Sequence, residues 1–386
     1  MAEIYDLAVV GLGALGASTA WHAAGRGLRV VGLEAFEFGH DRGASHDTSR
    51  IIRHSYHTPA YVDLTFAAYD AWSRLEDETG ERFVTVTGGL DLFPAGAQIA
   101  IEDYTGSMDA RGVAYDVLDA DAVRQRWPAF TLPDGTVALH QARTGIVPAA
   151  RGTAAMTRRA RELGATLCDN TPVQAITPRA DGADLVTPAG VFSVGRVVVT
   201  ADAWTAGLLA PLGVDIPLTV TEEQVTYFAP PRPELFAPEA FPVWIWMDEP
   251  SYYGFPTYGE ATVKAAQDCG GPTVTADERS GQPDDVMRER LSSFLRAVIP
   301  GSGTPVRSKR CLYTLTPDRD FVADRVPGHP GATVGLGAAH GFKFAAAFGG
   351  LLTDMAVEGE SRYDLSAFRL DRPGLTDPSY VGNWMV

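Results

Sequence analysis

A glycine-rich turn near the N-terminus constrains the fold more than any other feature of this sequence. Residues 7–10 form a short apolar run, the segment GLGALG follows directly at residues 11–16, and an alanine-rich stretch then extends to Ala24. This order predicts a strand, a tight turn and a helix. The apolar segment 28–34 predicts a second strand that finishes on Glu34, so the first 34 residues form one βαβ unit.

The glycine spacing predicts a site for an adenine dinucleotide. Gly11 permits the tight turn, Gly13 admits a pyrophosphate against the backbone, and Gly16 lets helix and strand pack closely. Glu34, at the end of the second strand, is placed to bind ribose hydroxyls. The motif does not separate FAD from NAD, but the carboxylate argues against the 2′-phosphate of NADP. A chance glycine turn is the alternative.

Composition narrows the class of protein. The chain has 386 residues, of which 45% are hydrophobic and 21% charged, which excludes disorder and collagen-like repeats. The length suggests two domains, or one large α/β assembly with an inserted module. A net charge of −16 disfavours nucleic acid and anionic membranes as partners.

Cysteine usage and the N-terminus point to the cytoplasm. Cys168, Cys269 and Cys311 are too scattered for a disulfide framework or a zinc site, so we expect no metal. The chain begins with acidic residues where a secretory signal carries positive charge, and no apolar run approaches the length of a membrane span.

Hydrophobic periodicity predicts the remaining elements. We expect helices over 59–81, 98–128, 147–166, 286–298 and 342–357. Strand-like patterns occupy 83–93 and three short stretches within 171–200, the last of which is expected to return to the first sheet. Aromatic and proline-rich runs over 217–264 suggest an antiparallel sheet.

Four further segments carry candidate functional side chains. Arg50 and Arg53 fall on one side if their segment is helical, although they are also compatible with a solvated surface pair. Lys264 follows β-branched residues and, if buried, would be a cation with a function. Two neighbouring cations would favour the thiolate of Cys311, with an inert buried thiol as the alternative. His340 and the glycine after it precede a predicted helix. Backbone amides at such a helix start can bind a ligand, although the segment is also compatible with helix packing alone.

Taken together, the order of these motifs resembles the monomeric sarcosine oxidase and N-methyltryptophan oxidase family of flavin-dependent amine oxidases, over nearly the whole chain. The segments that carry the resemblance are GLGALG (11–16) with Glu34, RIIRH (50–54), YYGFP (252–256), CLYT (311–314) and HGFKF (340–344).

The resemblance implies an α/β fold with a glutathione-reductase-like FAD-binding domain and a second, α+β substrate domain on a mixed or antiparallel sheet. The implied FAD-binding segments are 1–84, 147–215 and 309–386. The implied substrate-domain segments are 85–146 and 216–308.

It also implies roles for individual residues. Cys311 would carry the flavin covalently, and Arg53 with Lys343 would hold the substrate carboxylate. Lys264 would lie over the flavin and promote its reaction with oxygen. The other implied site residues are Arg50 beside the flavin, Tyr253 and Tyr313 in the substrate cavity, and Ser45, Val173, His340 and Gly341 at the cofactor.

Two departures from the family pattern bear on the substrate. Asp268 stands where sarcosine oxidases have a histidine, and an acid there would oppose a carboxylate and favour a further amine or hydroxyl. The stretch SHDTS (45–49) differs in spacing, so His46 is matched to the family histidine by type rather than by position. The tryptophans of VWIW (243–246) would line a larger cavity or pack in the core.

The sequence therefore predicts an FAD-dependent oxidase of an N-methyl or cyclic amino acid, which gives an imine and hydrogen peroxide. Activity is expected to rise with pH because the neutral amine reacts. The alternatives are a flavin dehydrogenase with another electron acceptor, a non-catalytic FAD-binding sensor, and a nicotinamide-dependent dehydrogenase. The resemblance favours a monomer.

Overall fold

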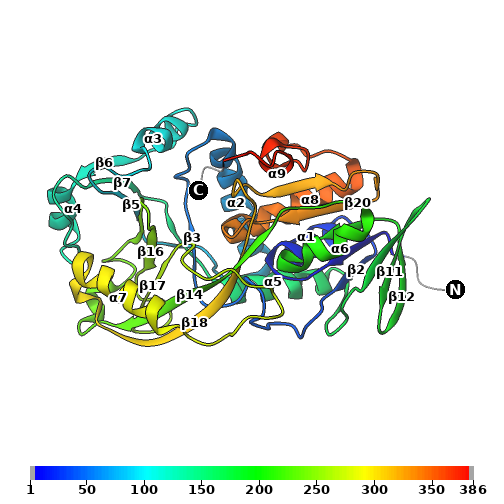
Figure 1. Cartoon of the computed structure of the whole chain (residues 1–386), viewed down its shortest axis with the longest axis horizontal. Helices are drawn as coiled ribbons and strands as arrows, with labels where there is room; N and C mark the ends of the chain where they lie inside the picture. The colour runs from blue at the N-terminus through cyan, green and yellow to red at the C-terminus, as the bar shows by residue number, and fades with distance from the viewer. Residues whose placement is uncertain (1–4, 382–386) are drawn as a thin grey trace.

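The structure is a computed structural model that describes residues 5–381. Residues 1–4 and 382–386, the outer ends of the first and last predicted segments, lie outside this range. The described residues form a six-stranded sheet, an eight-stranded sheet and two sheets of three strands. The six-stranded and eight-stranded sheets occupy opposite ends of an elongated molecule, and the long strands β14 (Thr219–Ala229) and β18 (Thr304–Leu315) run between the two ends (Figure 1).

The six-stranded sheet is parallel except for one edge strand, and its central strands are buried throughout. In spatial order it contains β19 (Val322–Arg325), β20 (Ala332–Leu336), β13 (Val197–Val199), β1 (Leu7–Val10), β2 (Val30–Leu33) and β9 (Thr166–Cys168), with β19 antiparallel. Such continuous apolar strands are typical of a parallel sheet covered on both faces. The predicted βαβ unit and the return of the segment 197–200 to this sheet are confirmed.

Alternate side chains of β1 face different layers. Leu7 and Val9 pack with the helices on one side, whereas Ala8 and Val10 pack with a small antiparallel sheet on the other. The helices are α1 (Ala14–Gly25), α2 (Pro59–Thr79), α5 (Ala149–Glu162) and α8 (Ala345–Glu358), and the small sheet is β10 (Ala175–Arg179), β11 (Gly182–Thr187) and β12 (Gly190–Val194). The short helices α6 (Thr205–Leu209) and α9 (Pro373–Thr376) complete this end.

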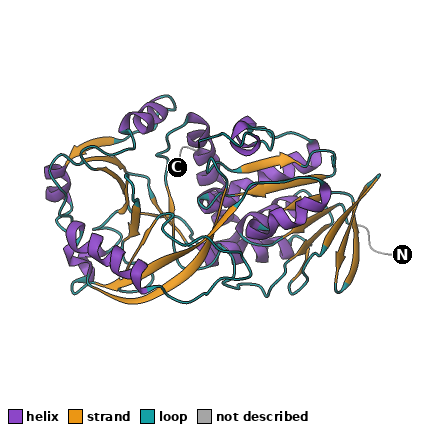
Figure 2. Ribbon diagram, viewed as in Figure 1, coloured by secondary structure: helices purple, strands orange, loops and turns teal. Residues whose placement is uncertain are grey.

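The eight-stranded sheet is mixed. Besides β14 and β18 it contains β17 (Val263–Gln267), β16 (Tyr252–Phe255), β15 (Val243–Trp246), β5 (Gly89–Phe93), β7 (Val137–Gln141) and β6 (Asp116–Asp119). The predicted antiparallel sheet over 217–264 is present, and β15 additionally pairs in parallel with β5. Helices α4 (Ala120–Arg126) and α7 (Asp285–Val298) lie at the end of the molecule away from the six-stranded sheet, and α3 (Ile101–Asp109) lies above β6 and β7 (Figures 1 and 2).

The structure corrects three local predictions and decides between two alternatives for a fourth. The stretch 98–128 is interrupted by strand β6, because the alternating segment DVLD pairs with β7. The range 171–200 holds four strands rather than three. Arg50 belongs to a strand, β3 (Arg50–Ile52), which pairs with β8 (Gly145–Val147), itself paired with β4 (Thr85–Val86), so the two arginines are not on a helix. Of the two alternatives for the tryptophans, core packing is the one observed, because Trp244 and Trp246 pack against Phe294 of α7.

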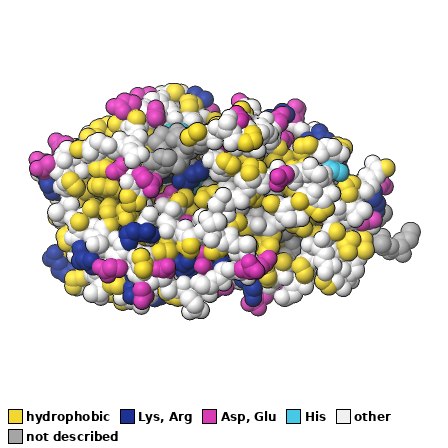
Figure 3. All heavy atoms as spheres, viewed as in Figure 1, with side chains coloured by type: hydrophobic (Ala, Val, Ile, Leu, Met, Phe, Trp, Pro, Cys, Tyr) yellow, Lys and Arg dark blue, Asp and Glu magenta, His cyan; other side chains and the backbone are white. Residues whose placement is uncertain are grey.

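Acidic and basic side chains are interspersed on the face shown in Figure 3. Across residues 5–381, no helix combines the length and apolar character needed to cross a bilayer. Within the same range, no group of three His, Cys, Asp or Glu side chains is placed to hold a metal ion.

Candidate active site

The glycine loop has the geometry that the sequence predicts. Gly11 has φ +86°, and a Cβ there would lie 2.8 Å from the carbonyl oxygen of Thr200. A Cβ on Gly16 would lie 1.9 Å from the carbonyl oxygen of Gly11, so helix and turn meet with no space for a side chain. Ser45 approaches the same loop and accepts a hydrogen bond of 2.9 Å from the Ala14 amide at the start of α1.

Glu34 is a buried and ionised carboxylate at the end of β2. It accepts hydrogen bonds from the amides of Leu12 (2.7 Å) and Phe36 (3.1 Å), and its Oε1 lies 3.3 Å from His40 Nε2. Burial raises the pKa of Glu34, but the hydrogen bonds from His40 and from the two amides outweigh burial and lower it. A charged acceptor beside a glycine loop fits the ribose hydroxyls of an adenine dinucleotide.

One cavity of about 910 Å³ joins the glycine loop to the mixed sheet. Its lining includes every predicted site residue except Gly16, which packs inside the turn, and Lys264, which lies behind the wall. The predicted residues that line it are Gly11, Gly13, Glu34, Ser45, His46, Arg50, Arg53, Val173, Tyr253, Asp268, Cys311, Tyr313, His340, Gly341 and Lys343. A cavity this large and continuous fits an extended dinucleotide together with a small substrate.

Arg53 and Lys343 are two buried basic side chains that lie near each other in the cavity lining. Arg53 Nη1 lies 3.2 Å from Asp91 Oδ1, and both side chains are about 5% exposed. Lys343, in the 3₁₀ turn Gly341–Phe344, donates to Tyr56 Oη and to the carbonyl oxygen of His340, each at 2.8 Å. Burial, with Arg53 nearby, lowers the pKa of Lys343 well below its usual range.

Asp91 was not identified from the sequence. It is the one acid in the strand segment GLDLF, all five residues of which are buried, and an acid inside such a run is the signal that could have found it. Burial raises the pKa of Asp91, while Arg53 opposes that shift.

Asp268 also has a cationic partner that sequence reasoning missed. Its Oδ2 lies 2.9 Å from Arg319 Nη2, and both residues line the cavity. Burial lowers the pKa of Arg319, but the charge of Asp268 outweighs it and raises the pKa. The expected opposition of Asp268 to a substrate carboxylate is therefore offset by Arg319.

Cys311 faces the cavity as a thiol rather than a thiolate. Burial raises its pKa to about 11, although Arg50 acts in the opposite direction. Of the two alternatives for this cysteine, the buried thiol is therefore the one supported, and its two basic neighbours do not favour the thiolate. Successive side chains of β18 point to opposite faces, so Arg310 pairs with Glu222 (3.1 Å), while Lys309 reaches Asp47 (3.3 Å).

The two tyrosines predicted for the substrate cavity lie together. Tyr253 Oη and Tyr313 Oη are 3.3 Å apart, one from β16 and the other from β18. Burial raises the pKa of both, so both are neutral hydroxyls that can donate to a ligand.

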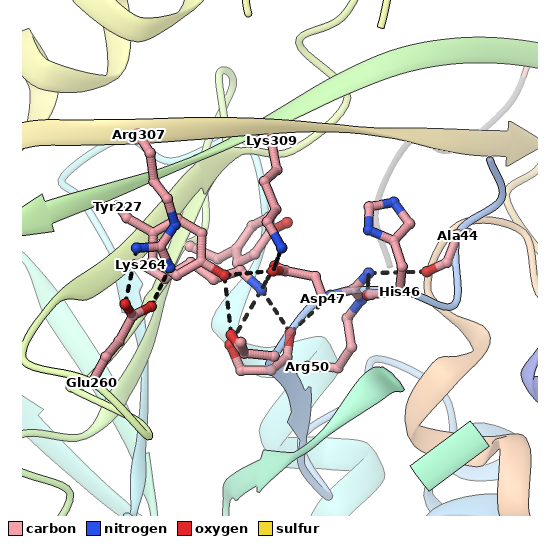
Figure 4. Close-up of polar contacts among 12 residues, drawn as sticks. Ala44, His46, Asp47, Arg50, Tyr227, Glu260, Lys264, Arg307 and Lys309 are labelled. Atoms are coloured by element: carbon pink, nitrogen blue, oxygen red, sulfur yellow. Dashed lines mark hydrogen bonds and ion pairs between the residues drawn. The ribbon is translucent and has the colours of Figure 1, made fainter. Parts of the chain in front are cut away.

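Lys264 lies behind the cavity wall beside the segment that carries Arg50. It is 3% exposed, donates to the carbonyl oxygen of Ser49 (2.8 Å), and lies 2.7 Å from Asp47 Oδ2. Arg50 donates to the carbonyl oxygens of Ala44 and His46 (Figure 4). The pKa of His46 falls to about 4 through burial and the charge of Arg50, so this histidine is neutral.

This fold and site define a flavoprotein class. A parallel sheet with a glycine loop and a buried acid forms one end, a mixed sheet with clustered cations forms the other, and one cavity joins them. Residues 6–355 match the FAD dependent oxidoreductase family named DAO, and the chain belongs to that family. The predicted resemblance is confirmed.

Individual relatives cover nearly the whole chain. A monomeric sarcosine oxidase of Streptomyces avermitilis is 33% identical over 378 residues, which cover 95% of this chain and 97% of that protein. An N-methyl-L-tryptophan oxidase of Yersinia pestis is 31% identical over 377 residues, with 95% and 99% covered. The open form of NikD, an unusual amino acid oxidase essential for nikkomycin biosynthesis, is 29% identical with a TM-score of 0.84 and covers 95% of this chain and 97% of its own.

Proposed function

We propose that this protein is an FAD-dependent oxidase of secondary amines that carry a carboxylate, such as N-methyl or cyclic amino acids. The observation that carries the proposal is the position of Lys343, a buried lysine that no carboxylate of the described residues contacts. Arg53 and Arg319 are each matched by an acid, Asp91 and Asp268, whereas Lys343 donates to two neutral oxygens. A buried lysine that no carboxylate contacts is a binding site for an anion, because a bound anion favours its charged form.

The reaction balances as a two-electron oxidation. The C–H bond next to the nitrogen breaks, a C=N bond forms, and the substrate loses two electrons and two protons in all; water then hydrolyses the imine. FAD, when bound, supplies the two-electron acceptor. Molecular oxygen takes up the two electrons and two protons to give hydrogen peroxide.

The chain's own residues bind and orient the substrate. Lys343 and Arg53 hold the carboxylate, and the Tyr253 and Tyr313 hydroxyls line the cavity beside it. These cations lower the pKa of a bound amine, because they disfavour a further positive charge. At saturating substrate, the rate of anaerobic flavin reduction therefore rises with pH.

Cofactor contacts follow from the same cavity. Gly11, Gly13, Ser45 and Val173 line it near Glu34, and His340 and Gly341 line it near Lys343. We assign these residues to FAD, with Cys311 as the covalent attachment point and Arg50 beside the flavin. The assigned FAD-binding segments are 1–84, 147–215 and 309–386, and the substrate segments are 85–146 and 216–308.

Oxygen and cellular context complete the proposal. Lys264 supports the reaction with oxygen, because a buried ammonium stabilises negative charge that develops on O₂.

The three cysteines of the described residues are free thiols, which fits a reducing cytoplasm. The protein is proposed to act as a monomer, like the sarcosine oxidases whose names say so.

The decisive experiment is the visible spectrum of the purified protein under anaerobic conditions during titration with secondary amines. The panel contains sarcosine, larger N-methyl amino acids, pipecolate and proline, each paired with its amide. Bleaching of the flavin band by the carboxylates, followed by one peroxide per flavin when oxygen is admitted, is the expected result. Bleaching without peroxide would indicate a dehydrogenase, and a yellow protein that none of the amines bleaches would indicate a sensor.

A further inference from the structure

Asp47 is a buried carboxylate surrounded by polar groups from three strands of the mixed sheet. Its Oδ2 lies 2.7 Å from Lys264 Nζ of β17, and its Oδ1 lies 3.3 Å from Lys309 Nζ of β18. Tyr227 of β14 donates a hydrogen bond of 2.6 Å to the same Oδ1. Figure 4 shows these side chains converging on Asp47. Because Asp47 and Lys264 are 2% and 3% exposed while Lys309 is 45% exposed, the buried pair is Asp47–Lys264.

The backbone also fixes the place of this carboxylate. Asp47 has φ +79°, in the left-handed region that Asp and Asn enter more readily than other non-glycine residues. Its carbonyl oxygen accepts a hydrogen bond of 3.0 Å from the amide of Ala150, in the first turn of α5. The segment before β3 is thereby tied to a helix of the nucleotide-binding end while its side chain reaches the mixed sheet.

The choice of lysine at position 264 makes its charge adjustable. The chain contains three lysines, Lys264, Lys309 and Lys343, and all its other basic side chains besides histidine are arginines. An arginine stays charged whatever surrounds it, whereas a buried lysine responds to its neighbours. Burial and Arg50 lower the pKa of Lys264 to about 8, and Asp47 opposes that shift.

We propose that Asp47 is the positioning residue for oxygen reduction, which keeps Lys264 in its ammonium form and in place beside Ser49. This inference rests on the proposed function, because it assigns Asp47 to the step in which Lys264 acts. The two electrons and one proton of hydrogen peroxide come from the reduced flavin, and the second proton comes from solvent. Asp47 and Lys264 undergo no net change in the cycle.

Other charged and titratable groups also lie around the Asp47–Lys264 pair, and their charges act on Lys264 as well. Arg50 of β3 and Lys309 of β18 add positive charge, whereas Tyr227, His46 and Cys311 are neutral near pH 7. Arg307 covers the ring of Tyr227 at 3.8 Å and is itself paired with Glu260. Asp47 is the carboxylate in direct contact with Lys264.

Asp47→Asn tests the assignment because it removes the charge, keeps the size and suits the left-handed backbone. The measurement is the rate of reoxidation by oxygen of substrate-reduced protein across pH. In the unaltered protein this rate falls as pH rises through about 8, as the ammonium is lost. In the variant the pH midpoint of the reoxidation rate moves down by at least about one unit. Reoxidation is then about fivefold slower at pH 8 and returns to its normal rate at low pH. Anaerobic flavin reduction changes far less.

Glu260→Gln is the matched control. It removes one negative charge from the same region, but Glu260 pairs with Arg307 rather than with Lys264. We expect the reoxidation midpoint to stay in place in this variant. An equal shift in both variants would mean that general electrostatics, rather than the Asp47–Lys264 contact, sets the charge of Lys264, and would overturn the inference.

Lys264→Met distinguishes a failure of the oxygen role of Lys264 from a failure of the role of Asp47. If it reoxidises at the normal rate, Lys264 has no role with oxygen, and both the oxygen step of the proposed function and the role of Asp47 fail. If it reoxidises slowly while Asp47→Asn keeps the normal midpoint, only the role of Asp47 fails.

The double variant Asp47→Asn, Lys264→Met covers the case in which Asp47→Asn does not fold. An unmatched buried lysine is strongly destabilising, so the double variant should fold where the single one does not. Failure of both to fold would show that Asp47 serves something other than Lys264, and would overturn the inference.

Discussion

Replacing Lys343 by methionine removes a buried lysine that contacts two neutral oxygens, and it keeps an unbranched side chain of similar length. The lysine ammonium has three N–H groups, and two of them donate to Tyr56 Oη and to the carbonyl oxygen of His340. One remains for a substrate carboxylate. A hydrogen bond to a charged group contributes about 1.5–3 kcal/mol, so we expect kcat/KM for carboxylate substrates to fall about 10- to 150-fold.

The assay compares an N-methyl amino acid with its amide in the same variant. Lys343→Met should lower kcat/KM for the acid and leave the amide nearly unchanged, because the amide carries no charge to match. Lys309→Met is the matched control, since Lys309 is 45% exposed and lies outside the cavity lining, and it should leave the acid-to-amide ratio unaltered. Equal losses for acid and amide in Lys343→Met would refute the carboxylate assignment.

Proton uptake gives a second readout of the same residue. Burial lowers the pKa of Lys343 well below its usual range, and a bound carboxylate favours the charged form and raises that pKa again. Binding of a carboxylate inhibitor should therefore take up a proton, and its affinity should fall as pH rises. Calorimetry in buffers of different ionisation enthalpy measures this uptake, which should disappear in Lys343→Met.

Three further predictions concern the cofactor. Glu34→Gln should weaken FAD binding by about 1–3 kcal/mol, because a charged acceptor for the ribose becomes neutral; equilibrium dialysis measures the change. Gly16→Ala should abolish FAD retention, because its Cβ would lie 1.9 Å from the Gly11 carbonyl oxygen, and flavin content after gel filtration reports it. Cys311→Ala should release all its flavin on acid precipitation, whereas the unaltered protein should keep its yellow colour in the pellet; release from both would rule out a covalent link.

Local sequence was sufficient to predict the nucleotide-binding unit. Gly11 and Gly16 are required by contacts within one turn, and Glu34 follows one helix and one strand later, so the information lies in about 25 consecutive residues. The buried strands of the parallel sheet are likewise apolar throughout, which makes them visible in a single sequence. The lining residues of the cavity were found mainly through the resemblance to a family.

Tertiary structure alone decided which charges meet. Asp47 and Lys264, Asp91 and Arg53, and Asp268 and Arg319 come from separate elements, and their pairing depends on strand order and register. The orientation of Cys311 depends on register as well, because a shift of one residue would exchange its face with that of Arg310. A sequence shows which ionisable side chains exist, but burial and long-range pairing set their charge, and both arise only when the two sheets enclose one cavity.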